Sequence, residues 1–503
     1  MTNFYVPWVG PDKGRVWILI VLLIAALFIS LLYIPVATCS ANDDQGICAA
    51  PVNPPGLQSL ETVGVPMWRS CPCNTSLTIR DSANARTLSN TVFANGESPP
   101  TPELRGLSSL GISILQFVLN DISAPVWNGT LYQVPIPVGD PFFPTPGNIS
   151  VPNSVIAIDG QGCYNPRSYT TPYIDLSNIY GVDSSRLSLQ LRAQRGGRML
   201  LETSDELLPY AGPGAAFLMA DPRDGYTADL VALHTLMVRN HNAWAERVAS
   251  IHQEWTDDQL FWKARQLNVA EWQHIVFTEW LPALLGSVAP AHRTSLTSFD
   301  SSLVAAVRLE VATVVGPAFV DTFTPATYQT ISWQAQHGIT NAATLIQTEG
   351  IDEMLVRMIK TPALAFDDRV INARRNLYNG TTPEDLVVTH VQRARNLRVP
   401  DWAAIYTCFG TAPIAGDSRD AYQGFLEEAI YPGTSAGLTG AALLGSELAR
   451  LRDADPYFYS FRRTEIGQIF WDDVLHGTMR GIIFRNGNVA FPQIGTGSLF
   501  FIK

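Results

Sequence analysis

The chain has 503 residues, of which 46% are hydrophobic, 16% are charged and 10% are aromatic, and its formal net charge is −11. This composition is typical of a folded globular protein, and its acidic balance argues against a nucleic-acid partner, which needs a basic surface. The charged fraction lies below the usual value of about 25%, and one apolar segment near the N-terminus accounts for part of that deficit.

The apolar segment at 16–37 contains no charged residue. It is long enough to cross a hydrocarbon core of about 30 Å at a helical rise of about 1.5 Å per residue. Lys13 and Arg15 precede it, and Asp43 and Asp44 follow it. The positive-inside rule therefore predicts a cytoplasmic N-terminus at 1–15, a transmembrane anchor, and an extracellular or luminal remainder. The alternative is a cleaved signal peptide with its cleavage site in the small residues at 37–41, which would give a secreted protein.

Two further features fit an exported chain. Glycosylation sequons begin at Asn74, Asn128, Asn148 and Asn379,. The cysteine count is six, and an even number in an exported chain predicts disulfides,. The pairing stays open: Cys39 with Cys48 is the simplest pair, whereas Cys71 and Cys73 are too close in sequence to bridge one another comfortably.

The remaining elements follow in chain order. Residues 38–78 are rich in Pro, Gly, Ser and Asn and predict an irregular leader before one large domain at 79–503. Helical patterns cover 107–118, 228–252, 257–285 and 303–315, whereas 125–170 is loop-like,. Thr256 with Gln259 has the spacing of a capping box at the start of the third of these helices,. Strand-like alternation is rare, so the fold class predicted is mainly α.

Several segments together resemble the animal haem peroxidases. These segments are IRDSAN at 79–84, TPYIDLSNIYG at 171–181, LHTLMVRNHNAWA at 233–245, VQRAR at 391–395 and WDDVL at 471–475. They occur in the order of the family's own motifs and span most of the chain. The resemblance implies one large, mainly helical peroxidase-like domain, to which the apolar segment at 16–37 adds the expected N-terminal transmembrane helix. It also implies a haem site whose residues can be compared position by position.

The distal helix of the family reads Gln-x-x-Asp-His-Asp, and here the matching stretch runs from Gln116 to Asp121. Gln116 keeps the distal glutamine. Asn120 stands where the family has its distal histidine, and Leu119 stands where an aspartate forms an ester with haem. An amide cannot take a proton near neutral pH, and the first histidine of the chain is His234, so no shift of alignment restores the base,.

The rest of the implied haem site is also altered. Arg223 keeps the distal arginine, but Tyr226 replaces the second ester-forming acid and Val311 occupies the position of the proximal histidine. His390 aligns with the asparagine that holds the proximal imidazole in the family, which makes it a candidate for an alternative haem ligand,. The resemblance gives His234, His241 and His274 structural roles.

A calcium site is implied by the same resemblance. Its ligands would be Asp121, Thr171, Tyr173 through its carbonyl, Asp175 and Ser177. Carboxylate, hydroxyl and carbonyl oxygens suit a hard cation.

The resemblance, with these replacements, predicts a catalytically inactive peroxidase-like ectodomain that binds calcium rather than haem. Its role would be structural or in protein interaction at a membrane, with a partner that the sequence does not name. The peroxidase-like outer domain of dual oxidases has comparable losses. The first alternative is a haem-dependent oxidoreductase that uses His390. The second is another small-molecule pocket in the vacated haem cavity, unless Leu119, Tyr226 and Val311 fill it.

Overall fold

The computed structural model describes residues 64–73, 83–94, 101–182, 191–202, 206–210, 217–292, 298–323, 342–379, 382–409 and 417–502. The predicted cytoplasmic segment, the anchor at 16–37, most of the leader and the sequon residue Asn74 lie outside these ranges. Within them, no helix combines the length and the apolar character that a membrane crossing requires.

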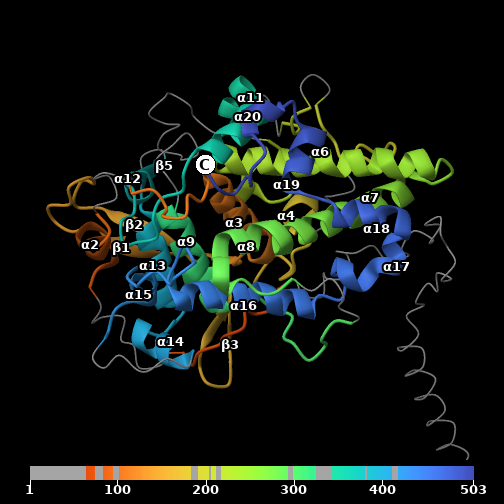
Figure 1. Cartoon of the computed structure of the whole chain (residues 1–503). Helices are drawn as coiled ribbons and strands as arrows, with labels where there is room; N and C mark the ends of the chain where they lie inside the picture. The colour runs from red at the N-terminus through yellow and green to blue at the C-terminus, as the bar shows by residue number, and fades with distance from the viewer. Residues whose placement is uncertain are drawn as a thin grey trace, which may run out of the picture.

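Long helices form the body of the molecule, as predicted, and Figure 1 shows α6 and α7 running side by side with α16 along the opposite edge. The longest are α3 (Ser109–Ile122), α6 (Ala228–Ile251), α7 (Asp257–Ile275), α11 (Ala342–Lys360), α13 (Leu386–Asn396) and α16 (Leu438–Ala454). Shorter helices are α2 (Ala85–Thr91), α4 (Ser177–Tyr180), α8 (Leu281–Leu285), α9 (Gly316–Phe323), α12 (Asn372–Arg375), α14 (Trp402–Cys408), α15 (Ala421–Leu426), α17 (Arg463–Ile466), α18 (Gln468–Leu475), α19 (Met479–Asn486) and α20 (Phe491–Ile494).

The helix α7 begins where the sequence predicts. The Thr256 hydroxyl accepts from the Gln259 amide at 3.3 Å, and the Gln259 side chain accepts from the Thr256 amide at 2.9 Å. This capping box satisfies two backbone amides that would otherwise have no partner at the start of the helix. The helix continues through a π-helical turn at Val276–Trp280 into α8, so the predicted span of 257–285 is helical throughout.

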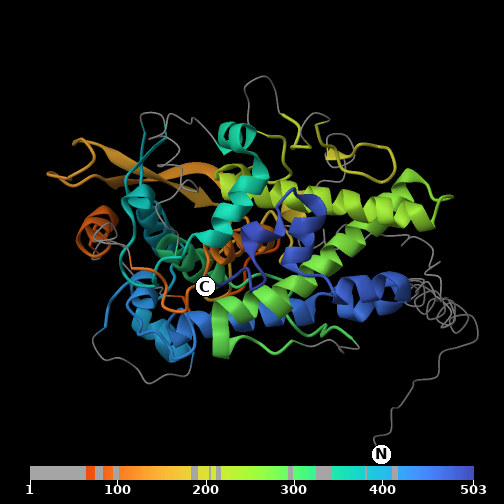
Figure 2. The same cartoon turned by 45° about the horizontal axis from the view of Figure 1, so that its top comes forward.

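The helix α3 lies at the centre of the fold. Every one of its residues is buried except Gln116, which is half-buried. A helix that is buried on all sides packs against neighbours on all sides, and α3 contacts α6, α9 and α11,. Figure 2 shows α3 enclosed within the helical body. The residues that it carries are therefore fixed in position by packing.

Two secondary-structure predictions are wrong. The stretch 125–170 contains the antiparallel hairpins β1 (Trp127–Pro135) with β2 (Asn148–Ser154) and β3 (Ile156–Ile158) with β4 (Tyr164–Pro166). A third described hairpin pairs β5 (Leu377–Asn379) with β6 (Thr382–Glu384). The strand β1 is exposed along nearly its whole length, so it lacks the alternation of apolar and polar residues by which a half-buried strand is recognised,.

The predicted helix at 303–315 also differs. Residues 303–308 are not helical. The Trp68 amide donates to the Val307 carbonyl at 2.9 Å, and the Arg308 amide donates to the Glu447 side chain at 2.6 Å. These tertiary bonds hold the backbone out of a helix as far as Arg308. The helix begins at Leu309, passes through a π-helical turn at Val311–Val315 and continues into α9, so only the first part of the predicted span is wrong.

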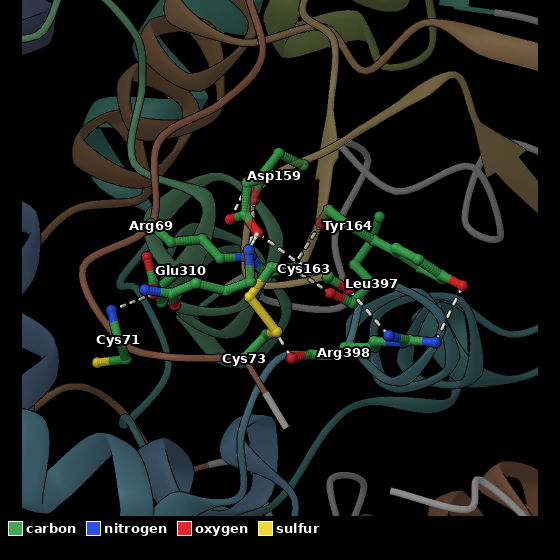
Figure 3. The surroundings of a disulfide bond; sticks show 12 residues. Arg69, Cys71, Cys73, Asp159, Cys163, Tyr164, Glu310, Leu397 and Arg398 are labelled. Carbon is green, nitrogen blue, oxygen red and sulfur yellow. Dashed lines mark hydrogen bonds between the residues drawn. A yellow bond between two sulfur atoms is a disulfide. The ribbon is translucent and has the colours of Figure 1, made fainter. Parts of the chain in front are cut away.

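Two disulfides join distant parts of the chain, which confirms the prediction that the cysteines form disulfides. Cys71 pairs with Cys408 and Cys73 pairs with Cys163. Figure 3 shows the second bond beside Arg69, whose Nε donates to Asn165 at 2.7 Å. The buried Glu310 accepts from the Cys71 amide at 3.1 Å. The short segment around these cysteines is thereby fixed to β4, to the segment 306–310 and to α14.

Candidate functional site

The distal position is occupied by a buried polar network. The Asn120 amide Nδ2 donates to Asp224 Oδ1 at 2.9 Å. The other oxygen of Asp224 accepts from Asn178 at 3.0 Å and lies 2.9 Å from His234 Nδ1. Burial raises the pKa of the fully buried Asp224 carboxyl, although the contacts to His234 and Asn120 oppose the rise. Asn120 is thus held by hydrogen bonds to a carboxylate and has no basic nitrogen to offer a substrate.

Asp224 was not among the residues that the sequence singled out. It immediately follows Arg223, but its partners lie up to 104 residues away along the chain. No spacing pattern connects such residues, so only the folded structure reveals the network. His234, for which the resemblance implied a structural role, is buried and lies within hydrogen-bonding distance of Asp224.

Arg223 is engaged with protein groups. Its Nη2 lies 2.6 Å from Asp221 Oδ2 and donates to the Asn120 carbonyl at 2.8 Å, while Nη1 donates to the Ser123 carbonyl at 2.7 Å. The last carbonyls of a helix have no partner within the helix, so a guanidinium there satisfies them and interacts favourably with the helix dipole. In this structure Arg223 caps the C-terminal end of α3.

The other two replaced positions behave differently from one another. Val311 is completely buried in the π-helical turn that precedes α9. Tyr226 follows the 3₁₀ turn Pro222–Gly225, which contains Arg223 and is called the Arg223 turn below. Its side chain is 62% exposed, so it does not fill the interior as the sequence hypothesis allowed.

Leu119 makes a close contact across the site. A methyl group placed on Gly316 would lie 2.7 and 2.8 Å from the two terminal carbons of the Leu119 side chain. Gly316 begins α9, directly after the turn that contains Val311. The helix that corresponds to the distal side therefore packs directly on the helix that corresponds to the proximal side.

These residues do not fit a haem bound in the manner that the resemblance implies. Such a haem lies between a distal base and a proximal imidazole. Here the two positions carry Asn120 and Val311, and the Leu119 side chain rests on Gly316 between their helices. Neither of the two axial positions offers iron an imidazole.

His390, the candidate alternative ligand, belongs to a second buried polar cluster. Its Nδ1 lies 2.6 Å from Asp321 Oδ2, which also accepts from the Tyr422 hydroxyl at 2.7 Å. Arg374 lies 2.8 Å from the other oxygen of Asp321. Burial would raise the pKa of Asp321, but the charges of His390 and Arg374 lower it to about 2, so the carboxyl is ionised and Nδ1 donates to it.

Three residues of the implied calcium site, Asp121, Asp175 and Ser177, lie in contact with one another. The Asp121 carboxylate accepts from the Ser177 amide at 2.6 Å, from the Ser177 hydroxyl at 2.9 Å and from the Leu176 amide at 3.1 Å. Leu176 adopts a left-handed conformation, with φ of 57°, that turns these two amides toward α3. Burial and then the charge of Asp175 raise the pKa of Asp121, which places the two carboxyl groups close together.

The donor set fits a hard cation. Thr171 is 1% exposed, and its hydroxyl oxygen has no hydrogen-bond partner among the described residues. A buried polar atom without a partner is costly, and a cation that took this oxygen as a ligand would remove the cost. The buried guanidinium of Arg265 interacts with both Asp175 and Asp121. Its single positive charge can balance only one of the two carboxylates. Tyr173 is buried in the same loop.

Two of the four glycosylation sequons have described, exposed asparagines. Asn128 lies in β1, where its Oδ1 accepts from the Thr130 hydroxyl at 2.7 Å, and Asn148 begins β2. Asn379 ends β5, but its side chain lies outside the described part of the structure.

The fold and this site define a helical, peroxidase-like class of protein. The family model for animal haem peroxidase matches residues 72–418, which is more than half of the chain, and the chain belongs to this family. The family resemblance inferred from the sequence segments is thereby confirmed.

Individual relatives agree with this assignment. The chain is similar to dual oxidase 2 of Homo sapiens, with 25% identity over 81% of this chain and 30% of the relative. It is also similar to peroxinectin A of Dictyostelium discoideum, with 24% identity over 61% of this chain and 65% of the relative. The chain thus spans less than a third of the dual oxidase.

Among solved structures, peroxidase A of Dictyostelium discoideum matches with a TM-score of 0.75. Its identity is 20% over 88% of this chain and 96% of that chain. At this identity the likeness shows the fold alone.

Proposed function

We propose that this chain is a catalytically inactive member of the family, a calcium-stabilised structural or protein-interaction component at a membrane. The contact between Leu119 and Gly316 carries the proposal, because it takes up space between the distal and proximal helices. Asn120 and Val311 at the two axial positions, and Arg223 as a helix cap, support it further.

The absorption spectrum of the full-length chain, expressed with haem supplied, tests the proposal. We expect a protein spectrum without a Soret band. A stoichiometric Soret band that persists through gel filtration would overturn it, and peroxide-dependent oxidation of a dye would do the same.

Calcium is the second part of the proposal. Its support is the buried Thr171 hydroxyl, which has no described partner, together with the neighbouring carboxyl groups of Asp121 and Asp175. We expect added calcium to raise the melting temperature after chelation with EDTA, and magnesium to have a smaller effect because it prefers stricter geometry.

A matched pair of variants tests the calcium ligands. Thr171→Val keeps the side-chain shape and removes the oxygen, so it should weaken the response to calcium. Thr170→Val alters the neighbouring hydroxyl, which contacts Ser168 at 3.3 Å, and should leave that response intact. A melting temperature that does not change with calcium in the unaltered chain would end this part of the proposal.

Attachment to a membrane is the third part. The uncharged segment 16–37 and the sequons with exposed Asn128 and Asn148 support an anchored, exported chain. Resistance to extraction at alkaline pH, with a mass that falls after treatment with an N-glycosidase, is the expected result. Complete release into the alkaline supernatant would favour the secreted alternative. The protein partner is unidentified.

A second candidate function is a haem-dependent oxidoreductase with His390 as the axial ligand. The observation that favours it is the bond from His390 Nδ1 to ionised Asp321, because ligand histidines usually donate their other ring nitrogen to a carboxylate,. If a Soret band appears, His390→Ala should abolish it under this candidate. A band that survives the substitution would exclude this ligand.

A further inference from the structure

A cavity of about 530 Å³ lies beside the C-terminal end of α3. Its walls come from 124–127, from 152–154 in β2, from α4 and from the Arg223 turn, and Arg393 of α13 completes them. The volume is within the range of about 300–1,000 Å³ that is usual for small-molecule sites. Because parts of the chain as distant as β2, α4 and α13 build it, the cavity is a product of the fold.

Most of the wall is apolar. Pro125, Val126 and Trp127 form one part of the lining, and Leu191 and Ala220 contribute elsewhere. The Trp127 ring is 60% exposed, and its Nε1 donates to the Thr130 carbonyl at 3.1 Å, which fixes the ring. A fixed aromatic ring offers a flat apolar surface with little loss of conformational entropy on binding.

The charges in the lining are unequal. Arg223 and Asp221 both line the cavity and form an ion pair with each other at 2.6 Å. Arg393 also lines it, and no hydrogen bond or ion pair joins its guanidinium to any described residue. Burial and then the positive charge of Arg223 lower the pKa of Arg393, so the two guanidinium groups lie near one another. The lining therefore carries one positive charge in excess.

We propose that this cavity binds an organic acid, with a single carboxylate against Arg393 and an apolar body along Trp127 and the neighbouring apolar wall. A carboxylate supplies the planar pair of acceptors that a guanidinium fork matches. The apolar lining selects an organic anion over an inorganic one. Arg223 of the implied haem site and Ser177 of the implied calcium site both line the cavity, but the proposal places neither iron nor calcium in it, so it stands whether or not the chain is inactive.

Calorimetric titration of the full-length chain in lipid nanodiscs tests this with two probe acids, hexanoate and 2-naphthoate. The two arms distinguish an alkyl from an aromatic body. Their neutral amides and inorganic phosphate serve as comparisons. We expect at least one acid to bind, with its amide and phosphate roughly tenfold or more weaker, since charge-assisted hydrogen bonds contribute about 1.5–3 kcal/mol.

Variants locate the site. Arg393→Gln should weaken binding of the acid roughly tenfold to a hundredfold, following the same estimate for a charge-assisted hydrogen bond. Arg463→Gln changes the same charge on α17, which contributes no described lining residue, and should leave the affinity unchanged. If Arg393→Gln fails to fold, Trp127→Ala replaces it as the test of the site. Trp127 lies at the exposed rim of the cavity, so this variant should fold and should bind the acid more weakly.

Four results would overturn the proposal. The first is no binding of either acid, and the second is equal binding of acid and amide. The third is an affinity that neither Arg393→Gln nor Trp127→Ala alters. The fourth is binding of phosphate as tight as that of the acids, because the apolar wall would then contribute nothing to recognition.

Discussion

Gly316 and Leu119 form the contact on which the proposal of a member of the family without haem chiefly rests. Gly316 has ordinary helical dihedral angles, with φ of −58° and ψ of −54°, so its lack of a side chain is not needed for backbone conformation. It is needed for the approach of Leu119. The two residues are therefore expected to depend on one another energetically.

Gly316→Ala should destabilise the protein by about 1–3 kcal/mol, because it forces a methyl group into a filled space. Without that clash, alanine would be favoured over glycine in a helix by about 1 kcal/mol. In the background of Leu119→Ala the same substitution should be neutral or stabilising. Chemical unfolding of the two single variants and the double variant gives the coupling energy.

A control for this cycle is Gly440→Ala in α16, where an added methyl group would meet its nearest neighbours at 3.4 Å, an ordinary contact. That variant should retain full stability. Additive effects of the Gly316 and Leu119 substitutions would mean that the two side chains do not meet, and the main support for a closed site would disappear.

At the scale of single residues, the sequence indicated which residue types occupy the family's site positions, but not which side chains touch one another. Comparison with the family's motifs indicated which residues replace the two histidines and the two ester-forming acids. It could not indicate that Leu119 meets a glycine 197 positions later, or that Asn120 is held by Asp224, since neither pair has a periodic spacing. It also left the orientation of Tyr226 open, and the structure places that side chain in solvent.

At the scale of the helices, Arg223 caps the C-terminal end of α3. The guanidinium donates to the carbonyls of Asn120, in the last turn of α3, and of Ser123, its C-cap residue. It also pairs with Asp221, the N-cap residue of the 3₁₀ turn Pro222–Gly225. The retained arginine is thus accounted for by its contribution to the stability of the helix end.

Arg223→Gln should lower the free energy of unfolding by about 1–2 kcal/mol, because it removes charge-assisted bonds to the end of the helix. The denaturant midpoint measures this. An exposed arginine on α17, changed in Arg463→Gln, provides the comparison and should have little effect,. A midpoint unaffected by Arg223→Gln would indicate that the arginine is kept for something other than the cap.

Helices with apolar periodicity and a capping signal were predictable, as the bounds of α6 and α7 confirm. The hairpin of β1 and β2 was not, because its exposed faces remove the apolar alternation. The prediction at 303–315 failed in its first part for another reason: hydrogen bonds to Trp68 and Glu447 outweigh local helical preference before Leu309. Local patterns cannot report bonds to residues more than a hundred positions away.

The whole molecule has a continuous apolar core that includes residues from Met67 to Phe500. Polar groups inside that core are matched to particular protonation states. His241 is completely buried, with Nε2 2.9 Å from the Gly197 carbonyl and Nδ1 2.9 Å from the Tyr180 hydroxyl. The hydroxyl of Tyr180 already accepts from Asn268 at 2.8 Å. A neutral imidazole satisfies all three contacts.

Burial lowers the pKa of His241 to about 3, and the charges of Arg265 and Arg192 act in the same direction. In the unfolded chain the value is about 6.5. Between these values the unfolded chain binds more protons than the folded one, so stability is full above pH 6.5 and falls as the pH decreases toward 3. The slope that this histidine contributes is at most about 1.4 kcal/mol per pH unit.

Thermal unfolding from pH 7 to pH 4 checks this expectation. His241→Asn should flatten the dependence on pH, even if it lowers stability overall. His476→Asn alters an exposed histidine on the surface and should leave the slope as it is. Identical slopes for the unaltered chain and His241→Asn would show that another group governs acid unfolding.

The bond between Cys71 and Cys408 spans 337 positions of the sequence. Any protease that cuts the backbone once between these two residues leaves fragments that remain covalently joined. A molecule nicked between these residues therefore keeps its apparent mass on a gel until it is reduced. To separate the N-terminal segment from the cross-linked part of the chain, a protease must cut before residue 71. Under the proposal that the N-terminus is anchored in a membrane, release of the cross-linked part of the chain therefore requires a cut before residue 71.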